Sequence, residues 1–208
     1  NKAGLQRMLS QRIARNFLMI GAGVDAQNAQ KDLDNNLAIF EQNLSELQDY
    51  SKSKELKTQL SKVEQLWFSY RVKAISKPTK ELAVEVLSLS EELLAASEEM
   101  VALIQKTSAV QQAKLVNTSG RQRMLSQRIA KSYLAMYWGI NYPKADQELN
   151  NAMQSYESGL NTLENDSLTT ADIKQTLFKV RAQWDFAKSG FKRSEEGKFV
   201  PFVIVRTS

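Results

Sequence analysis

One arginine stands in a short string that occurs twice in the chain, and its chemistry suits an anion. Residues 6–14 and 122–130 both read QRMLSQRIA, nine identical residues in a row. On a helix, Arg7 and Gln11 lie on one stripe because they are four positions apart. A guanidinium group is planar and presents paired donors, so it fits a planar oxyanion such as nitrate or nitrite. Arg7 and its repeat Arg123 are therefore candidate ligand-binding residues.

The rest of this stripe suits contact between two equivalent helices. Ala14 allows close approach, while Gln11 and its repeat Gln127 can form hydrogen bonds. Two arginines that meet at such an interface repel each other, and a small anion between them relieves the repulsion. Gly4 and Gly120 lie one turn earlier and, without a Cβ, let a ligand reach the backbone. Helical arginines more often stay in water or pair with carboxylates, so a purely structural role is the alternative.

Composition excludes several kinds of site. The chain has no His and no Cys, which rules out His- or Cys-ligated metals, a Ser-His-Asp triad and a thiol nucleophile. We also find no catalytic carboxylate pair, and we expect no enzyme activity, no metal and no cofactor. The net charge of +5 comes from 28 basic and 23 acidic residues, a mixed surface that does not indicate nucleic-acid binding.

The duplication extends well beyond the repeated string. Apolar and aromatic positions such as Leu33, Phe40 and Leu44 recur 116 residues later. With one inserted residue, Trp67 corresponds to Trp184. The sequence therefore predicts two modules, residues 1–116 and residues 117–208.

Each module has the pattern of amphipathic helices. In the first module we predict helices over residues 2–22, 27–50 and 54–75, and a fourth that begins after Thr79. The predicted fold is all-α, with two tandem antiparallel four-helix bundle modules. We expect the second module to lack most of its last helix.

The final residues, 198–208, read KFVPFVIVRTS and allow two interpretations. The repeat predicts the first turns of an eighth helix, whereas Val203 to Val205 alone would suggest a strand. We prefer the helix. A shortened fourth helix should leave an apolar groove in the second module.

The connection between the modules also allows two interpretations. Residues 79–140 contain no Pro, and Gly120 is the only Gly before Gly139, which favours one continuous helix. Arg7 and Arg123 would then lie far apart, and each would need a second chain. The alternative is a break at residues 117–120, which would let the modules fold back and pair their first helices within one chain.

The segments Asn1–Arg12, NKAGLQRMLSQR, and Asn117–Arg128, NTSGRQRMLSQR, resemble the opening motif of the PilJ/NarX-like sensor domain. This resemblance implies a four-helix bundle that dimerises through its first helix. It also implies a place in the extracytoplasmic part of nitrate/nitrite sensor kinases or chemotaxis receptors. In nitrate-sensing members, an Arg from each protomer binds one anion beside a Gly one turn earlier. By motif position, these roles fall on Arg7 with Gly4 and on Arg123 with Gly120.

Residues and resemblance together predict a sensor of the periplasm or of the extracellular face of the inner membrane. We expect it to bind nitrate or nitrite, to form a homodimer through its first helices, and to act on a signalling partner protein. It departs from the family pattern in its tandem modules and in Ser119 and Arg121, which replace Ala3 and Leu5. The alternative is a structural or protein-interaction bundle with no small-molecule ligand.

Overall fold

The computed structural model describes residues 2–106, 112–195 and 200–207, and within these ranges the chain forms eight helices and no strand. The all-α prediction is therefore confirmed. The helices are α1 (Lys2–Gly21), α2 (Ala26–Tyr50), α3 (Lys54–Ala74), α4 (Lys80–Lys106), α5 (Gln112–Tyr137), α6 (Ala145–Asn165), α7 (Ala171–Glu195) and α8 (Pro201–Thr207).

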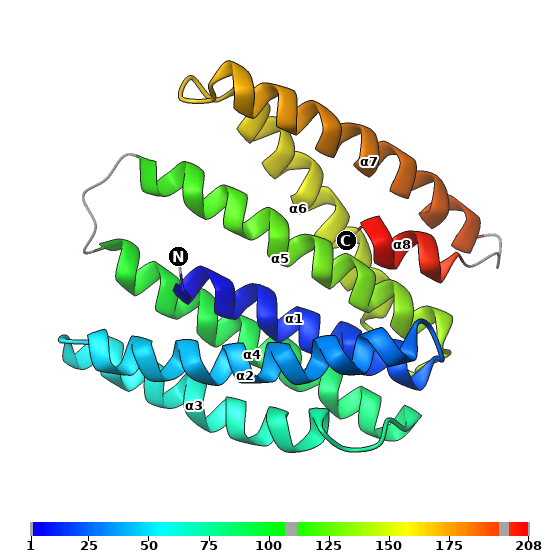
Figure 1. The fold of residues 1–208 in the computed structure, drawn as a ribbon, viewed down its shortest axis with the longest axis horizontal. Helices are drawn as coiled ribbons and strands as arrows, with labels where there is room; N and C mark the ends of the chain where they lie inside the picture. Colours follow the sequence, from blue (N-terminus) through cyan, green and yellow to red (C-terminus); the bar gives the residue numbers. More distant parts are fainter. Residues whose placement is uncertain (1, 107–111, 196–199, 208) are drawn as a thin grey trace.

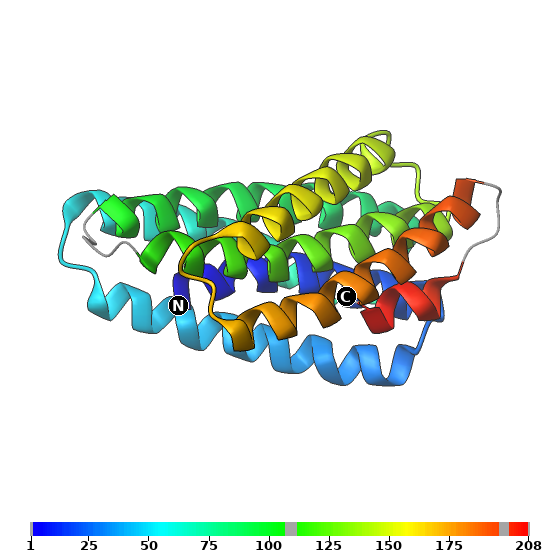
Figure 2. The same ribbon diagram turned by 90° about the horizontal axis from the view of Figure 1, so that it is seen from above.

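The two repeated helices, α1 and α5, pack side by side at the centre of the molecule (Figure 1). Arg7 near the start of α1 contacts Asn117, and Gly21 at its end lies against Trp138 just after α5. The two helices are therefore parallel. Helices α2 and α4 pack on α1, while α6 and α8 pack on α5. Most helices run roughly along the long axis in both views (Figure 2).

The continuous helix predicted for residues 79–140 is wrong. Helix α4 ends at Lys106, α5 begins at Gln112 and runs in the opposite direction, and residues 107–111 lie outside the described part. The physical reason is burial, because folding back lets α5 cover its apolar residues against α1. The alternative is confirmed in that the first helices of the two modules, α1 and α5, pair within one chain. Its break at residues 117–120 is absent, since α5 runs through them and through the predicted module boundary at residue 116.

Both repeated helices end in the same way. Gly23 and Gly139 have φ angles of 69° and 67°, which a residue without a Cβ adopts without strain. The N–H of Val24 donates to the carbonyl of Met19, and the same 6→1 bond recurs from Ile140. These bonds form a Schellman motif, and the following Val24 and Ile140 are buried.

The duplication is also preserved in the packing between helices. Phe40 stacks on Trp67 with ring centroids 4.0 Å apart, and Tyr156 lies against Trp184 at 4.5 Å in the second module. Gln6 donates its side-chain amide to the carbonyl of Phe40 at 3.1 Å. Gln122 makes the same 3.1 Å bond to Tyr156. Each first helix is thus held to the second helix of its own module by the same polar contact.

The fourth helices of the two modules differ most. Helix α4 has 27 residues and packs along α1 and α3, whereas α8 has seven and contacts α5 and α7. The helical interpretation of residues 198–208 is confirmed for Pro201–Thr207, and the strand is not formed there. Thr79 accepts a hydrogen bond from the backbone N–H of Leu82, as predicted for the residue that caps α4.

Candidate functional site

The candidate site lies at the interface between α1 and α5, where the guanidinium of Arg7 is buried. Only 1% of the Arg7 surface is exposed. Its Nη1 donates to Oε2 of Glu98 on α4 at 3.0 Å, and its Nη2 donates to Oδ1 of Asn117 on α5 at 2.8 Å. Its Nε is buried without a hydrogen-bond partner among the described residues. One arginine thus connects α1, α4 and α5.

Both predicted glycines lie beside this arginine. A Cβ placed on Gly4 would lie 3.4 Å from Nη2 of Arg7, and one placed on Gly120 would lie 3.5 Å from the same atom. The glycines come from different modules, so the pairing of α1 with α5 brings them together. Nη2 of the guanidinium therefore lies beside backbone without a side chain in both α1 and α5.

The two predicted glutamines take other roles. Gln11 donates its side-chain amide to the carbonyl of Ser90 at 2.9 Å, which joins α1 to α4. Gln127 donates to the hydroxyl of Ser126, 3.4 Å away. Neither of these bonds involves a guanidinium group, so both glutamines join helices or neighbouring side chains instead of contacting Arg7 or Arg123.

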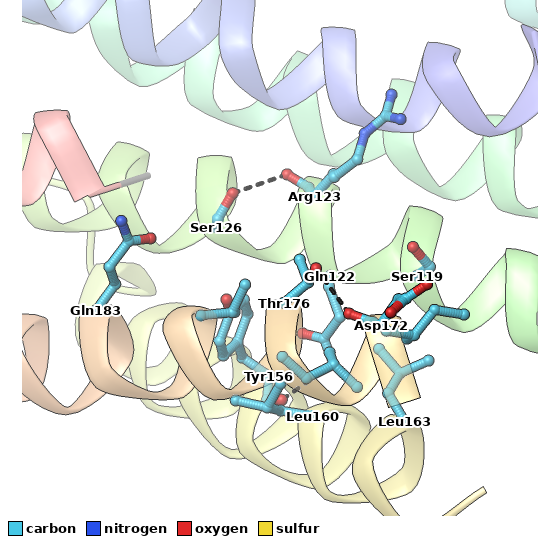
Figure 3. A pocket seen from close by; sticks show the side chains of 13 residues that line it. Ser119, Gln122, Arg123, Ser126, Tyr156, Leu160, Leu163, Asp172, Thr176 and Gln183 are labelled. Carbon is cyan, nitrogen blue, oxygen red and sulfur yellow. Dashed lines mark hydrogen bonds between the residues drawn. The ribbon is translucent and has the colours of Figure 1, made fainter. Parts of the chain in front are cut away.

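Arg123 has a different environment from Arg7, although the two stand in identical strings. Its side chain is exposed, and it has no salt bridge within the described ranges. Its guanidinium points away from the cavity beside it, in the direction of α1 (Figure 3). The structure therefore makes one enclosed arginine site from the two sequence repeats.

Sequence reasoning missed Glu98 and Asn117 as partners of Arg7. Asn117 could have been found, because it opens the second repeated segment as Asn1 opens the first. Glu98 has no such signal. It is separated from Arg7 by 91 positions, and its contact depends on how α4 is rotated against α1.

A second polar cluster holds α4 to the second module. Glu91 on α4 forms salt bridges with Arg128 and with the fully buried Lys131, both on α5. Burial alone would raise the pKa of Glu91, but the charges of Lys131 and Arg128 outweigh it and lower the pKa below its ordinary value. Lys131 also donates to the hydroxyl of Ser90 at 3.1 Å. This cluster explains the two basic residues of the second copy, Arg128 and Lys131, that lie off the stripe of the repeated arginine.

The second module contains a cavity of about 470 Å³ between α5, α6 and α7 (Figure 3). Leu177 and Val180 of α7 line it, and their counterparts Leu60 and Val63 in the first module are completely covered. Helix α4 packs against α3 in the first module, whereas the shorter α8 leaves this part of α7 open. The cavity is thus the apolar groove expected from a shortened fourth helix.

Comparisons with known proteins assign a family. The model of the type IV pili methyl-accepting chemotaxis transducer N-terminal domain, PilJ, matches residues 1–90 and again residues 105–196. Neither the curated proteins nor the solved structures provide a match. No helix among the described residues is long and apolar enough to span a membrane. The two matched regions cover most of the chain, which therefore belongs to the PilJ family of chemotaxis transducer sensing domains.

Proposed function

We propose that this protein is an extracytoplasmic sensor that binds a small planar oxyanion, nitrate or nitrite, where α1 meets α5. The observation that carries the proposal is the buried guanidinium of Arg7, enclosed between the two repeated helices. A buried cation needs a negative partner, because an uncompensated charge is costly away from water, and the partly exposed Glu98 fills that role here. The family supports a sensing role.

The geometry favours a small and flat ligand. Nη1 and Nη2 of Arg7 donate to two planar groups, the carboxylate of Glu98 and the side-chain amide of Asn117. Nitrate and nitrite are planar and carry one negative charge, so they can accept paired N–H donors in the same manner. The adjacent backbone of Gly4 and Gly120 leaves no side chain in the way.

Binding would change the charge balance at a junction of three helices. Arg7 links α1 to α4 and to α5, and these helices belong to both modules. An anion that interacts differently with two arrangements of these helices would shift the population between them. A signalling partner protein would then respond to the favoured arrangement.

Within this proposal the site needs one chain, because α1 and α5 supply both sides of it. A homodimer through the first helices stays a prediction, which light scattering with and without nitrate would test. An extracytoplasmic location also stays a prediction, which the family supports, and fractionation of cells expressing the full protein would test it.

Calorimetric titration with nitrate tests the site. We expect Arg7→Ala to weaken binding by about 10- to 150-fold, the usual effect of losing a charge-assisted hydrogen bond. Arg12→Ala is the matched control, because Arg12 has the same charge on the same helix but pairs with Asp32 on α2. Arg7→Lys keeps the charge and should still weaken binding, since an ammonium group cannot present the paired donors. Circular dichroism checks that each variant folds.

The ion pair between Arg7 and Glu98 favours a second candidate, a helical bundle without a ligand. In that case Arg7 only joins helices, and Glu98 already supplies its negative partner. The same titration separates the two candidates, because a bundle of this kind would give no heat of nitrate binding with any of the variants.

A further inference from the structure

The carboxylate of Glu98 lies against the guanidinium of Arg7, inside the site proposed for the anion. Its Oε2 lies 3.0 Å from Nη1 of Arg7. The side chain of Arg7 is 2% exposed, whereas that of Glu98 is 32% exposed. The arginine is thus fixed inside the protein, and the carboxylate reaches it from the surface with a route back to water.

A carboxylate group resembles the proposed ligand closely. It is planar, it carries one negative charge, and it accepts N–H donors in the plane of the guanidinium, as nitrite and nitrate do. Because Glu98 is part of α4, it stays close to Arg7 and its effective concentration there is high. A free anion must therefore compete with a tethered one.

We propose that Glu98 is a built-in competitor that sets the anion affinity of the Arg7 site, and that a bound anion displaces it. This inference rests on the proposed function. When Glu98 leaves, α4 loses its ion pair with Arg7 and keeps the bond from Gln11 to Ser90. Displacement thus removes one tie between α1 and the C-terminal half of α4, while the bond from Gln59 of α3 to Ala96 still holds that half.

The second module lacks this competitor. Arg123 has no acidic partner in the described ranges, and its side chain is exposed. An exposed guanidinium gains little from an anion, because water screens the attraction. The enclosed site at Arg7 is therefore the one that Glu98 regulates, and Arg123 should contribute little to affinity.

Nitrate titrations of the 208-residue chain and its Glu98→Gln variant test the inference. Glutamine keeps the size of the side chain but removes its charge, so we expect nitrate to bind at least about tenfold more tightly than to the unchanged protein. Glu99→Gln is the matched control, because Glu99 is next in sequence but pairs with Lys62 at the exposed surface. It should leave the affinity unchanged.

A second experiment uses thermal unfolding of Glu98→Ala, which removes the carboxylate and leaves its space. Formate and nitrate should each raise the midpoint of this variant more than chloride does at equal ionic strength. Neither formate nor nitrate should raise the thermal midpoint of Glu99→Ala more than chloride does. Rescue of this kind would support the proposal even if Glu98→Gln were too unstable for titration.

The outcomes separate this inference from the proposed function. Nitrate binding with equal affinity to the unchanged chain and to Glu98→Gln would overturn the competitor and leave the sensor proposal standing. No nitrate binding by the unchanged chain, by Glu98→Gln or by Glu98→Ala would overturn both. Tighter binding by Glu99→Gln as well would show a general effect of charge and would also overturn the specific role of Glu98.

Discussion

The two modules carry the same nine-residue string but place its arginine in opposite environments. Arg7 is 1% exposed and pairs with Glu98 and Asn117. Arg123 is exposed and has no ion pair in the described part of the chain. The backbone carbonyls of both arginines accept the same hydrogen bond, from Ser10 and Ser126. The helix backbone around the two arginines is therefore the same, and the difference in their burial and pairing comes from the neighbouring helices.

Helix α4 is the main source of that difference. It packs along the length of α1 and α3 and supplies Glu98, whereas α8 covers only one end of its groove. A motif thus defines which side chains are available, and the helix packed against it decides whether they are buried and paired. The predictions below compare matched residues of the two modules.

The largest loss of stability is expected for a leucine in the core of the first module, compared with its counterpart in the second module. Leu60 is 1% exposed, and its counterpart Leu177 lines the cavity of the second module. We expect Leu60→Ala to lower the free energy of unfolding by about 2 to 5 kcal/mol. Leu177→Ala should cost roughly 1 to 2 kcal/mol, because the leucine lacks packing partners on one side. Urea unfolding of the two variants measures both values, and equal losses would contradict the comparison.

The next difference in stability is expected between alanine variants of the two repeated arginines, Arg7 and Arg123. Arg7→Ala breaks a buried ion pair, and breaking such a pair usually lowers the free energy of unfolding by about 3 to 5 kcal/mol. We expect a smaller loss of about 2 to 3 kcal/mol here, because Glu98 is partly exposed to water. Arg123→Ala should change the free energy of unfolding by less than about 0.5 kcal/mol, as is usual for an exposed residue. Urea unfolding without nitrate tests this pair of values. A loss with Arg123→Ala as large as that with Arg7→Ala would show that Arg123 has a partner of its own.

Much of the fold could be predicted from the sequence, because its signals are local or repeated. The helix periodicity, the duplication and the capping role of Thr79 all depend on residues close together in the chain. The direction of α5 could not be predicted. A helix that continues and a helix that folds back share the same local pattern, and they differ only in the burial of α5 against α1.

For the candidate site, the sequence indicated Arg7 and both glycines but not Glu98. The glycines and the arginine stand in the repeated motif, so the repeat marks them. Glu98 is one of several acidic residues on α4, and Glu91, Glu92 and Glu99 stand near it. Choosing among them requires the rotation of α4 about its axis, which side-chain packing along the whole bundle determines.

A small gain in stability is expected at Gly120, where stability and binding should change in opposite directions. Gly120 lies inside α5, and a Cβ there would lie 3.5 Å from Nη2 of Arg7, an ordinary contact. Gly120→Ala should therefore raise the free energy of unfolding by about 0.4 to 1 kcal/mol, because alanine restricts the unfolded chain. The same methyl group would cover backbone beside Arg7, so nitrate should bind more weakly. Gly23→Ala is the matched control: its φ of 69° should make the substitution destabilising by about 1 kcal/mol without an effect on nitrate. Urea unfolding and nitrate titration of both variants test this, and unchanged nitrate affinity in Gly120→Ala would place the anion away from α5.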